Sequence, residues 1–119
     1  MSISKESSPA SSVHQQAVDE RRLSEAAGVF ALLADSTRLH LLWLLAQEEA
    51  DVGTLSERCA ASRTGVSQHL AKLRLAGLVD TRREGRHVVY RLTDGHLRRL
   101  VIEALSHADH RVTGAAAHD

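Results

Sequence analysis

The sequence predicts a mostly α-helical chain with one small β-hairpin, in the winged helix-turn-helix class. Three observations support this prediction. Apolar residues recur every three or four positions along several segments, which is the spacing of amphipathic helices. Near the middle of the chain, a short helical segment, a three-residue joint and a second helical segment follow one another. An alternating apolar and polar stretch then surrounds an arginine-rich turn, as in a β-hairpin.

The length and composition are those of one globular domain, with 119 residues, 43% of them hydrophobic and 25% charged. The single cysteine, Cys59, excludes a disulfide framework and a four-thiolate zinc site within the chain. The longest apolar run, Leu41 to Ala46, is too short to cross a bilayer, and nothing resembles a secretory signal. We therefore expect a soluble cytoplasmic protein with no membrane partner.

The first part of the chain predicts a flexible tail and two helices. Residues 1–14 form the tail, because the first dozen contain six serines and the only proline without an apolar period. Helical spacing then runs from residue 23 to residue 34. Asp35 offers a capping side chain for the second helix, whose apolar residues lie between 39 and 46.

The next two helices make the helix-turn-helix candidate. Asp51 or Thr54 caps a short third helix that ends at Cys59. Ser62 caps a fourth helix that runs to Ala76.

A hairpin and a last helix complete the prediction. Gly77 ends the fourth helix, and residues 78–92 form the hairpin, or wing, with a basic tip. Asp94 precedes an amphipathic helix that ends near residue 110, and residues 111–119 form a flexible C-terminal tail. Residues 15–110 are thus the predicted DNA-binding and dimerisation domain.

The uneven distribution of charge suggests a DNA-binding surface. The chain is neutral overall, but residues 63–91 carry a net charge of +5 and residues 32–62 a net charge of −3. A basic module attracts phosphate, a helix fits the major groove, and arginines at a hairpin tip reach the backbone or the minor groove. The candidate DNA-binding residues are Arg63, Thr64, Ser67, Gln68 and Lys72 on the fourth helix and Arg82, Arg83 and Arg86 on the wing. The same residues also fit a solvated helix face and a turn that blocks edge pairing, and composition alone leaves both interpretations open.

Five short segments in combination are more specific than any one of them alone. They read FALLADSTRL at 30–39, VSQHLAKL at 66–73, AGLV at 76–79, REGR at 83–86 and YRL at 90–92. Together they resemble the ArsR/SmtB family of dimeric winged-helix repressors, many of which release their operator when metal binds. The resemblance covers roughly residues 25–110. It implies that Arg63, Thr64, Ser67 and Gln68 lie at the family's base- and backbone-contacting positions, and the tip from Arg83 to Arg86 on its wing.

The resemblance directs attention to two alternative metal sites. The thiolate site of the family's metalloid and cadmium sensors uses a Cys-Val-Cys element before the helix-turn-helix. This chain has Asp51, Val52 and Gly53 there, and Cys59 cannot replace both sulfurs. We therefore do not expect metalloid sensing through that site.

The last helix carries the second candidate set, Asp94, His96, His107 and His110. His96 and His107 are eleven residues apart, which places them on one helix face but about 16 Å apart along the axis. One metal ion cannot span that distance, whereas two copies of the helix packed antiparallel bring Asp94 and His96 of one copy to His107 and His110 of the other. The spacing predicts a homodimer with two equivalent intersubunit sites, and it also resembles the last-helix site of the family's zinc, nickel and cobalt sensors. A helix cap at Asp94 and a favourable dipole at the C-terminal histidines are the alternative interpretation.

The expected effector is a divalent transition metal ion. Three imidazoles and one carboxylate make a closed four-coordinate site, which suits zinc. Additional ligands from His14 and His118 would favour nickel or cobalt, and we favour these two metals over zinc.

The resulting hypothesis is a metal-responsive repressor. The metal-free homodimer binds double-stranded operator DNA with two recognition helices about 34 Å apart, and metal favours a dimer that no longer fits. The alternative is a repressor of the same fold with a non-metal signal or with none. A metalloenzyme is disfavoured because the proposed ligands leave no open position and no catalytic set lies near them, so we expect no small-molecule substrate. A metal-buffering protein would not need the basic wing.

Overall fold

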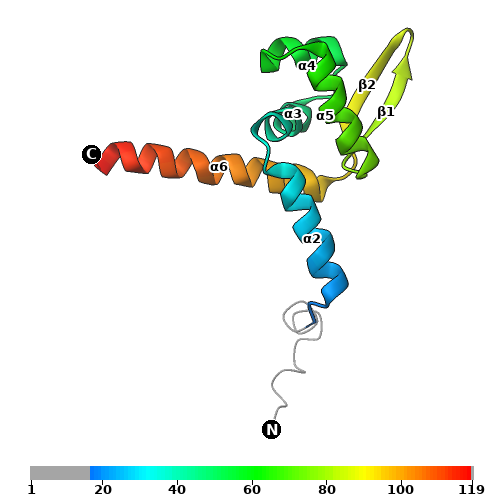
Figure 1. The fold of residues 1–119 in the computed structure, drawn as a ribbon. Coiled ribbons are helices and arrows are strands. Elements are labelled where there is room, and N and C mark those ends of the chain that lie inside the picture. The colour runs from blue at the N-terminus through cyan, green and yellow to red at the C-terminus, as the bar shows by residue number, and fades with distance from the viewer. Residues whose placement is uncertain (1–16, 119) are drawn as a thin grey trace. The chain divides into compact units, whose positions relative to one another are not determined.

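The computed structural model describes residues 17–118, with side chains described as far as Gly114. The chain divides after Leu32 into two compact units. The first unit contributes helix α2, Glu20–Leu33, which is shown in blue to cyan in Figure 1. Asp19 caps this helix, because its Oδ1 accepts a hydrogen bond from the backbone N–H of Arg22 at 2.8 Å. Leu23 and Phe30 of α2 are more than half exposed.

The second unit begins with the three predicted helices. Helix α3 spans Ser36–Gln47, α4 spans Val52–Cys59 and α5 spans Arg63–Leu75. Their N-caps are Asp35, Asp51 and Ser62, each of which accepts a hydrogen bond from a backbone N–H three residues on. The cap at Asp51 decides between the two candidates for the start of the third helix. These caps confirm the predicted helix-turn-helix, with a three-residue joint between α4 and α5.

The wing is a two-stranded antiparallel sheet of β1, Val79–Glu84, and β2, His87–Leu92. Val79 pairs with Leu92 at one end, and Glu84 pairs with His87 beside the tip. Gly85 makes the tight turn with a φ of +63°, a backbone conformation that glycine adopts without a steric penalty. The hairpin is therefore as predicted.

Helix α6 spans Gly95–His118 and starts at the predicted cap, because Oδ1 of Asp94 accepts the N–H of Leu97 at 2.8 Å. Leu97 and Val101 are buried on the side that packs against α3. The helix is longer than predicted: it continues through residues 111–118, where the sequence suggested a flexible tail. Three consecutive alanines at 115–117, the strongest helix formers, account for the extension. In Figure 1 the C-terminal half of α6 projects beyond α3, α4 and α5.

Aliphatic side chains from every element of the second unit form its core. The fully buried ones are Leu41, Leu42, Leu45, Leu55, Leu70, Leu73, Val66, Val79 and Val101. No single helix between residues 17 and 118 has the length and apolarity needed to cross a membrane; α2 and α3 pass that test only when they are counted together.

Candidate nucleic-acid interface and metal-binding helix

Helix α5 has one buried side and one polar side. Val66, Leu70 and Leu73 are fully buried in the core. The predicted contact residues on the other side are exposed, and four of them, with Ala71, line a shallow surface depression. The exposed residues are Arg63, Thr64, Ser67, Gln68 and Lys72. The structure thus gathers the predicted recognition residues on one accessible helix face.

Arg63 at the start of α5 lies against the start of α4. A Cβ added to Gly53 would stand 2.7 Å from a terminal guanidinium nitrogen of Arg63, so the guanidinium occupies the space that a side chain would need. Asp51 is also close enough for the Arg63 charge to contribute to lowering the pKa of its carboxyl. No sequence pattern indicates this role of Gly53, because the contact joins two different helices.

Asp51 also contacts the wing. Its Oδ2 lies 3.2 Å from Nδ1 of His87 on β2, while its Oδ1 accepts the N–H of Thr54 at 2.9 Å. The hydrogen bond from the Thr54 N–H is the largest cause that lowers the pKa of Asp51, and the nearby His87 and Arg63 add to it. The residue that begins α4 therefore also contacts the wing and lies close to Arg63 of α5.

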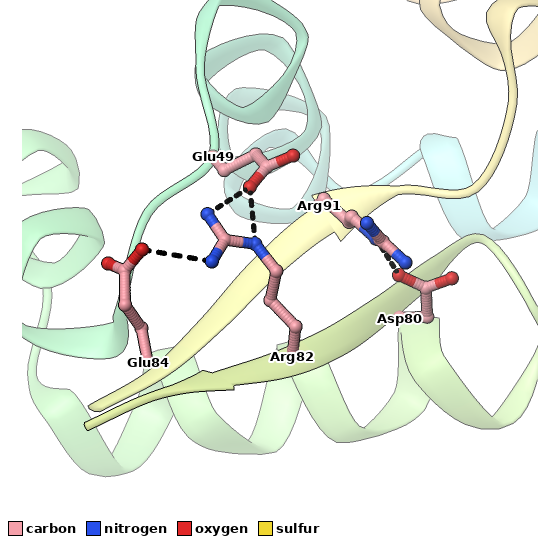
Figure 2. Close-up of polar contacts among 5 residues, drawn as sticks. All are labelled: Glu49, Asp80, Arg82, Glu84 and Arg91. Atoms are coloured by element: carbon pink, nitrogen blue, oxygen red, sulfur yellow. Dashed lines mark hydrogen bonds and ion pairs between the residues drawn. The ribbon is translucent and has the colours of Figure 1, made fainter. Parts of the chain in front are cut away.

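The three predicted wing arginines differ in their surroundings. Arg82 donates hydrogen bonds to Glu49 and Glu84, which Figure 2 shows, and these bonds raise the pKa of Arg82, that of Glu84 most. Arg83 and Arg86 are exposed, and their side chains have no hydrogen bond or ion pair with any residue in the described part of the chain. Arg91 pairs across the hairpin with Asp80 at 2.6 Å, also shown in Figure 2. Of the three predicted wing arginines, Arg83 and Arg86 are thus the two without a side-chain partner among the described residues.

The predicted metal ligands lie along α6. His96, His107 and His110 are exposed on the helix, and Asp94 caps it. Among the residues that the structure describes, no three His, Cys, Asp or Glu side chains within one copy are placed to hold a metal ion. A single copy therefore does not assemble the set, which agrees with the spacing argument but leaves the intersubunit site a prediction.

The donor chemistry of α6 fits a transition metal after one rearrangement. A guanidinium nitrogen of Arg99 lies 2.8 Å from Nδ1 of His96. Because a guanidinium only donates, this contact makes Nδ1 the acceptor and places the proton on Nε2. His96 must therefore lose this contact before either ring nitrogen can act as a ligand, because a proton moved from Nε2 to Nδ1 would face a donor. Imidazole and carboxylate donors are otherwise those that zinc, nickel and cobalt take in proteins.

The structure draws attention to one residue that the sequence reasoning missed. Glu103 is exposed on α6, seven residues after His96 and four before His107, and so lies on the same helix face. The spacing of four residues between Glu103 and His107 is the sequence feature that could have identified Glu103. Of the two possible additional ligands, His14 lies outside the described residues, and His118 ends α6 with its side chain outside the described part.

Cys59 does not belong to either candidate site. It is half-buried near the end of α4, and burial raises the pKa of its thiol, which disfavours the metal-binding thiolate. Two facts therefore argue against a thiolate site: the Cys-Val-Cys element is missing, and the thiol of Cys59 has a raised pKa.

Comparison with known proteins connects these features to a family. Residues 35–81 match the family model described as "Bacterial regulatory protein, arsR family". The chain is 49% identical over 90 residues to the HTH-type transcriptional regulator KmtR of Mycobacterium tuberculosis, over 76% of this chain and 69% of KmtR. It is 44% identical over 86 residues to the biofilm growth-associated repressor of Agrobacterium fabrum, over 72% of this chain and 73% of that protein.

A solved structure supports the same assignment of the fold. A homodimeric winged helix-turn-helix DNA-binding domain from Mycobacterium bovis, a possible ArsR-family transcriptional regulator, is similar with a TM-score of 0.70 and 32% sequence identity. The similarity covers 82% of this chain and 94% of that domain.

Proposed function

Because the chain belongs to the bacterial ArsR family of regulatory proteins, we propose that it is a metal-responsive repressor that releases operator DNA on binding nickel, cobalt or zinc. Its family makes it a DNA-binding transcriptional repressor that acts as a homodimer and not an enzyme. The metal response and the residues assigned below are our proposal, as is a place in the cytoplasm beside the DNA that it regulates.

The DNA-binding part of the proposal assigns the exposed face of α5 to the major groove. Gln68 and Arg63 are side chains suited to bidentate base contacts, and Thr64, Ser67 and Lys72 lie on the same face. The wing tip, with Arg83 and Arg86, reaches flanking phosphate or the minor groove. Two copies place two such helices about 34 Å apart on a near-palindromic operator.

The single observation that carries the metal response is the exposed histidine face of α6. His96, His107 and His110 point away from the side on which Leu97 and Val101 are buried, so no core packing requires them. Exposed imidazoles at these positions become neighbours across a two-fold axis when two α6 helices pack antiparallel. Asp94, His96, His107 and His110 would then hold the ion between the two copies.

The residues of the chain link this site to DNA binding through the dimer. The ion supplies a bond between the two α6 helices and thereby favours one dimer geometry. Because α6 packs on α3, and α3 packs on α5, a change at α6 can alter the spacing of the two recognition helices. Coupling between two binding equilibria is reciprocal, so operator DNA must weaken metal binding by the same factor.

The alternative is a regulator that responds to a non-metal signal or to none. One observation favours it: Asp94 and His96 already have structural contacts, the first as the cap of α6 and the second with Arg99. These contacts need no metal.

A cobalt titration separates the two. We expect the metal-free protein to bind about one Co²⁺ per chain with visible absorption bands, intense for four ligands and weak for six. Intense bands indicate zinc as the effector, and weak bands indicate nickel or cobalt with added ligands such as His14 and His118. Absence of any spectral change would leave the alternative.

The His107→Ala variant tests the site itself. It should bind a duplex selected with the metal-free protein as tightly as the wild type does, but should no longer release it when metal is added. His40→Ala, which removes an exposed histidine from α3, is the matched control and should release DNA normally. Metal-driven release by His107→Ala would show that the ligands are elsewhere.

A further inference from the structure

The wing contacts three consecutive residues of the segment between α3 and α4, Glu49 to Asp51, which we call the connector. Glu49 accepts two hydrogen bonds from Arg82 of β1, at 2.9 and 2.7 Å. Ala50 and Tyr90 of β2 exchange two backbone hydrogen bonds, at 3.2 and 2.8 Å. Asp51 contacts His87. The connector thus adds one residue pair of sheet to the wing and a side-chain contact on each side of it.

All three nitrogens of the Arg82 guanidinium take part in hydrogen bonds. Nε and one terminal nitrogen bond to Oε1 of Glu49, and the other terminal nitrogen bonds to Glu84 at 2.9 Å (Figure 2). The side chains of Arg82 and Glu49 are only 40% and 41% exposed. Two carboxylates therefore already occupy three of the five N–H donors of Arg82 and offset its charge toward an approaching phosphate. Arg83, its neighbour in β1, has no such partner among the described residues.

We propose that Arg82 is a positioning residue of the DNA interface, which fixes the wing to the connector through Glu49 and does not contact phosphate. The contacts with the DNA backbone fall to Arg83 and Arg86 at the tip. This inference rests on the proposed role of the wing in DNA binding, and it gives Arg82 a different role from the phosphate contact predicted for it from the sequence.

For the substitution Glu49→Gln, the proposal and long-range electrostatics predict opposite changes in DNA affinity. Glu49→Gln removes a negative charge from a domain that binds a polyanion, so charge alone predicts tighter binding. If Glu49 holds Arg82 and the wing, the same substitution weakens binding. Glu48→Gln is the matched control, because it removes the same charge one residue away and Glu48 contacts Arg58 of α4 rather than the wing.

The experiment measures the affinity of the metal-free homodimer for a selected duplex at several salt concentrations. Arg82→Gln and Glu49→Gln should each weaken binding by about two- to fivefold, the range that exposed ion pairs typically give. The double variant should be no weaker than Arg82→Gln alone, because both changes break one contact. Glu48→Gln should bind at least as tightly as the wild type.

The salt dependence separates positioning from phosphate contact. Each phosphate contact contributes about 0.9 to the slope of log K against log salt, so Arg86→Gln should reduce the slope of the dimer by about 1.8. Arg82→Gln should leave the slope at the wild-type value. Circular dichroism melts of each variant show whether the fold is intact, and Arg82→Lys provides a milder change if Arg82→Gln unfolds.

Two results would overturn the inference. One is a slope reduction for Arg82→Gln as large as that for Arg86→Gln, together with unchanged or tighter binding by Glu49→Gln. The other is an unchanged slope and affinity for Arg86→Gln, which would remove the wing from the interface. No metal is present in these measurements, so neither result bears on the proposed metal response.

Discussion

Asp51 joins the start of α4 to the wing, and its replacement by alanine or asparagine separates its two contacts. Alanine removes both the cap on the Thr54 N–H and the carboxylate that faces His87. Loss of an N-cap costs about 1 kcal/mol, and loss of the exposed side-chain contact with His87 adds between about 0 and 1 kcal/mol. Asparagine keeps a side-chain oxygen for the cap and loses only the charge. We therefore expect Asp51→Ala to destabilise the fold by about 1 to 1.5 kcal/mol and Asp51→Asn by less than about half of that.

Thermal unfolding at equal dimer concentration measures this difference. For a domain of about 100 residues, the alanine variant should melt roughly 4 to 10 °C below the wild type. The hydrogen bond from the Thr54 N–H is the main cause that lowers the pKa of Asp51 in the folded protein below its ordinary value. The ionised carboxylate therefore stabilises the fold fully at pH values above the ordinary pKa of an aspartate. This contribution is lost as the pH falls through the folded pKa.

The dependence of melting temperature on pH below about pH 5 tests the assigned role of the Asp51 carboxylate. The stability difference between wild type and Asp51→Asn should hold above about pH 5 and shrink below about pH 4. Equal melting temperatures for the alanine and asparagine variants would show that the cap contributes nothing. A difference that grows on acidification would contradict the assigned direction of the pKa shift.

Three other changes test separate parts of the structure. Gly53→Ala should change the melting temperature little, because the added Cβ is closest to the flexible end of Arg63 and reaches Asp51 Oδ1 only at an ordinary contact distance of 3.7 Å. Gel-shift titration should nevertheless show weaker operator binding, and this loss should disappear in an Arg63→Gln background. Leu70→Ala should destabilise the fold by about 2 to 5 kcal/mol, measured by urea unfolding, because Leu70 is fully buried. Unfolding that matches the wild type would contradict its place in the core. Arg99→Ala should tighten Co²⁺ binding severalfold in a competition titration, because it frees Nδ1 of His96; weaker binding would mean that Arg99 supports the site.

Much of the fold was predictable because its signals are local. All five described helices begin after residues whose side chains bond to an N–H only three positions away, and the caps among them that the sequence offered are Asp35, Asp51, Ser62 and Asp94. The polar face of α5 follows from helical period in the same way. The length of α6 was underestimated, because Gly114 and the histidines near the end suggested fraying while the three following alanines favour helix.

Apart from Glu103 and the length of α6, the missed features are contacts between residues distant in sequence. Glu49 and Arg82 are 33 positions apart, and no periodic pattern relates them. The backbone pairing of Ala50 with Tyr90 likewise depends on how the wing folds back onto the connector. Such contacts are settled by tertiary packing, so the sequence identified the basic wing but not which of its arginines are engaged.

The same distinction changes what the charge of the DNA-binding segment means. Residues 63–91 hold seven basic side chains, and the sequence offers all of them to phosphate. In the structure Arg82 and Arg91 are each hydrogen-bonded to carboxylates. Five basic residues per copy then remain, so these segments of the dimer account for a salt slope no steeper than about −9, whereas seven would allow about −13. A measured slope steeper than the first value would require Arg82, Arg91 or basic residues outside the segment to reach the DNA, and the slope of the Arg82→Gln variant would show whether Arg82 is among them.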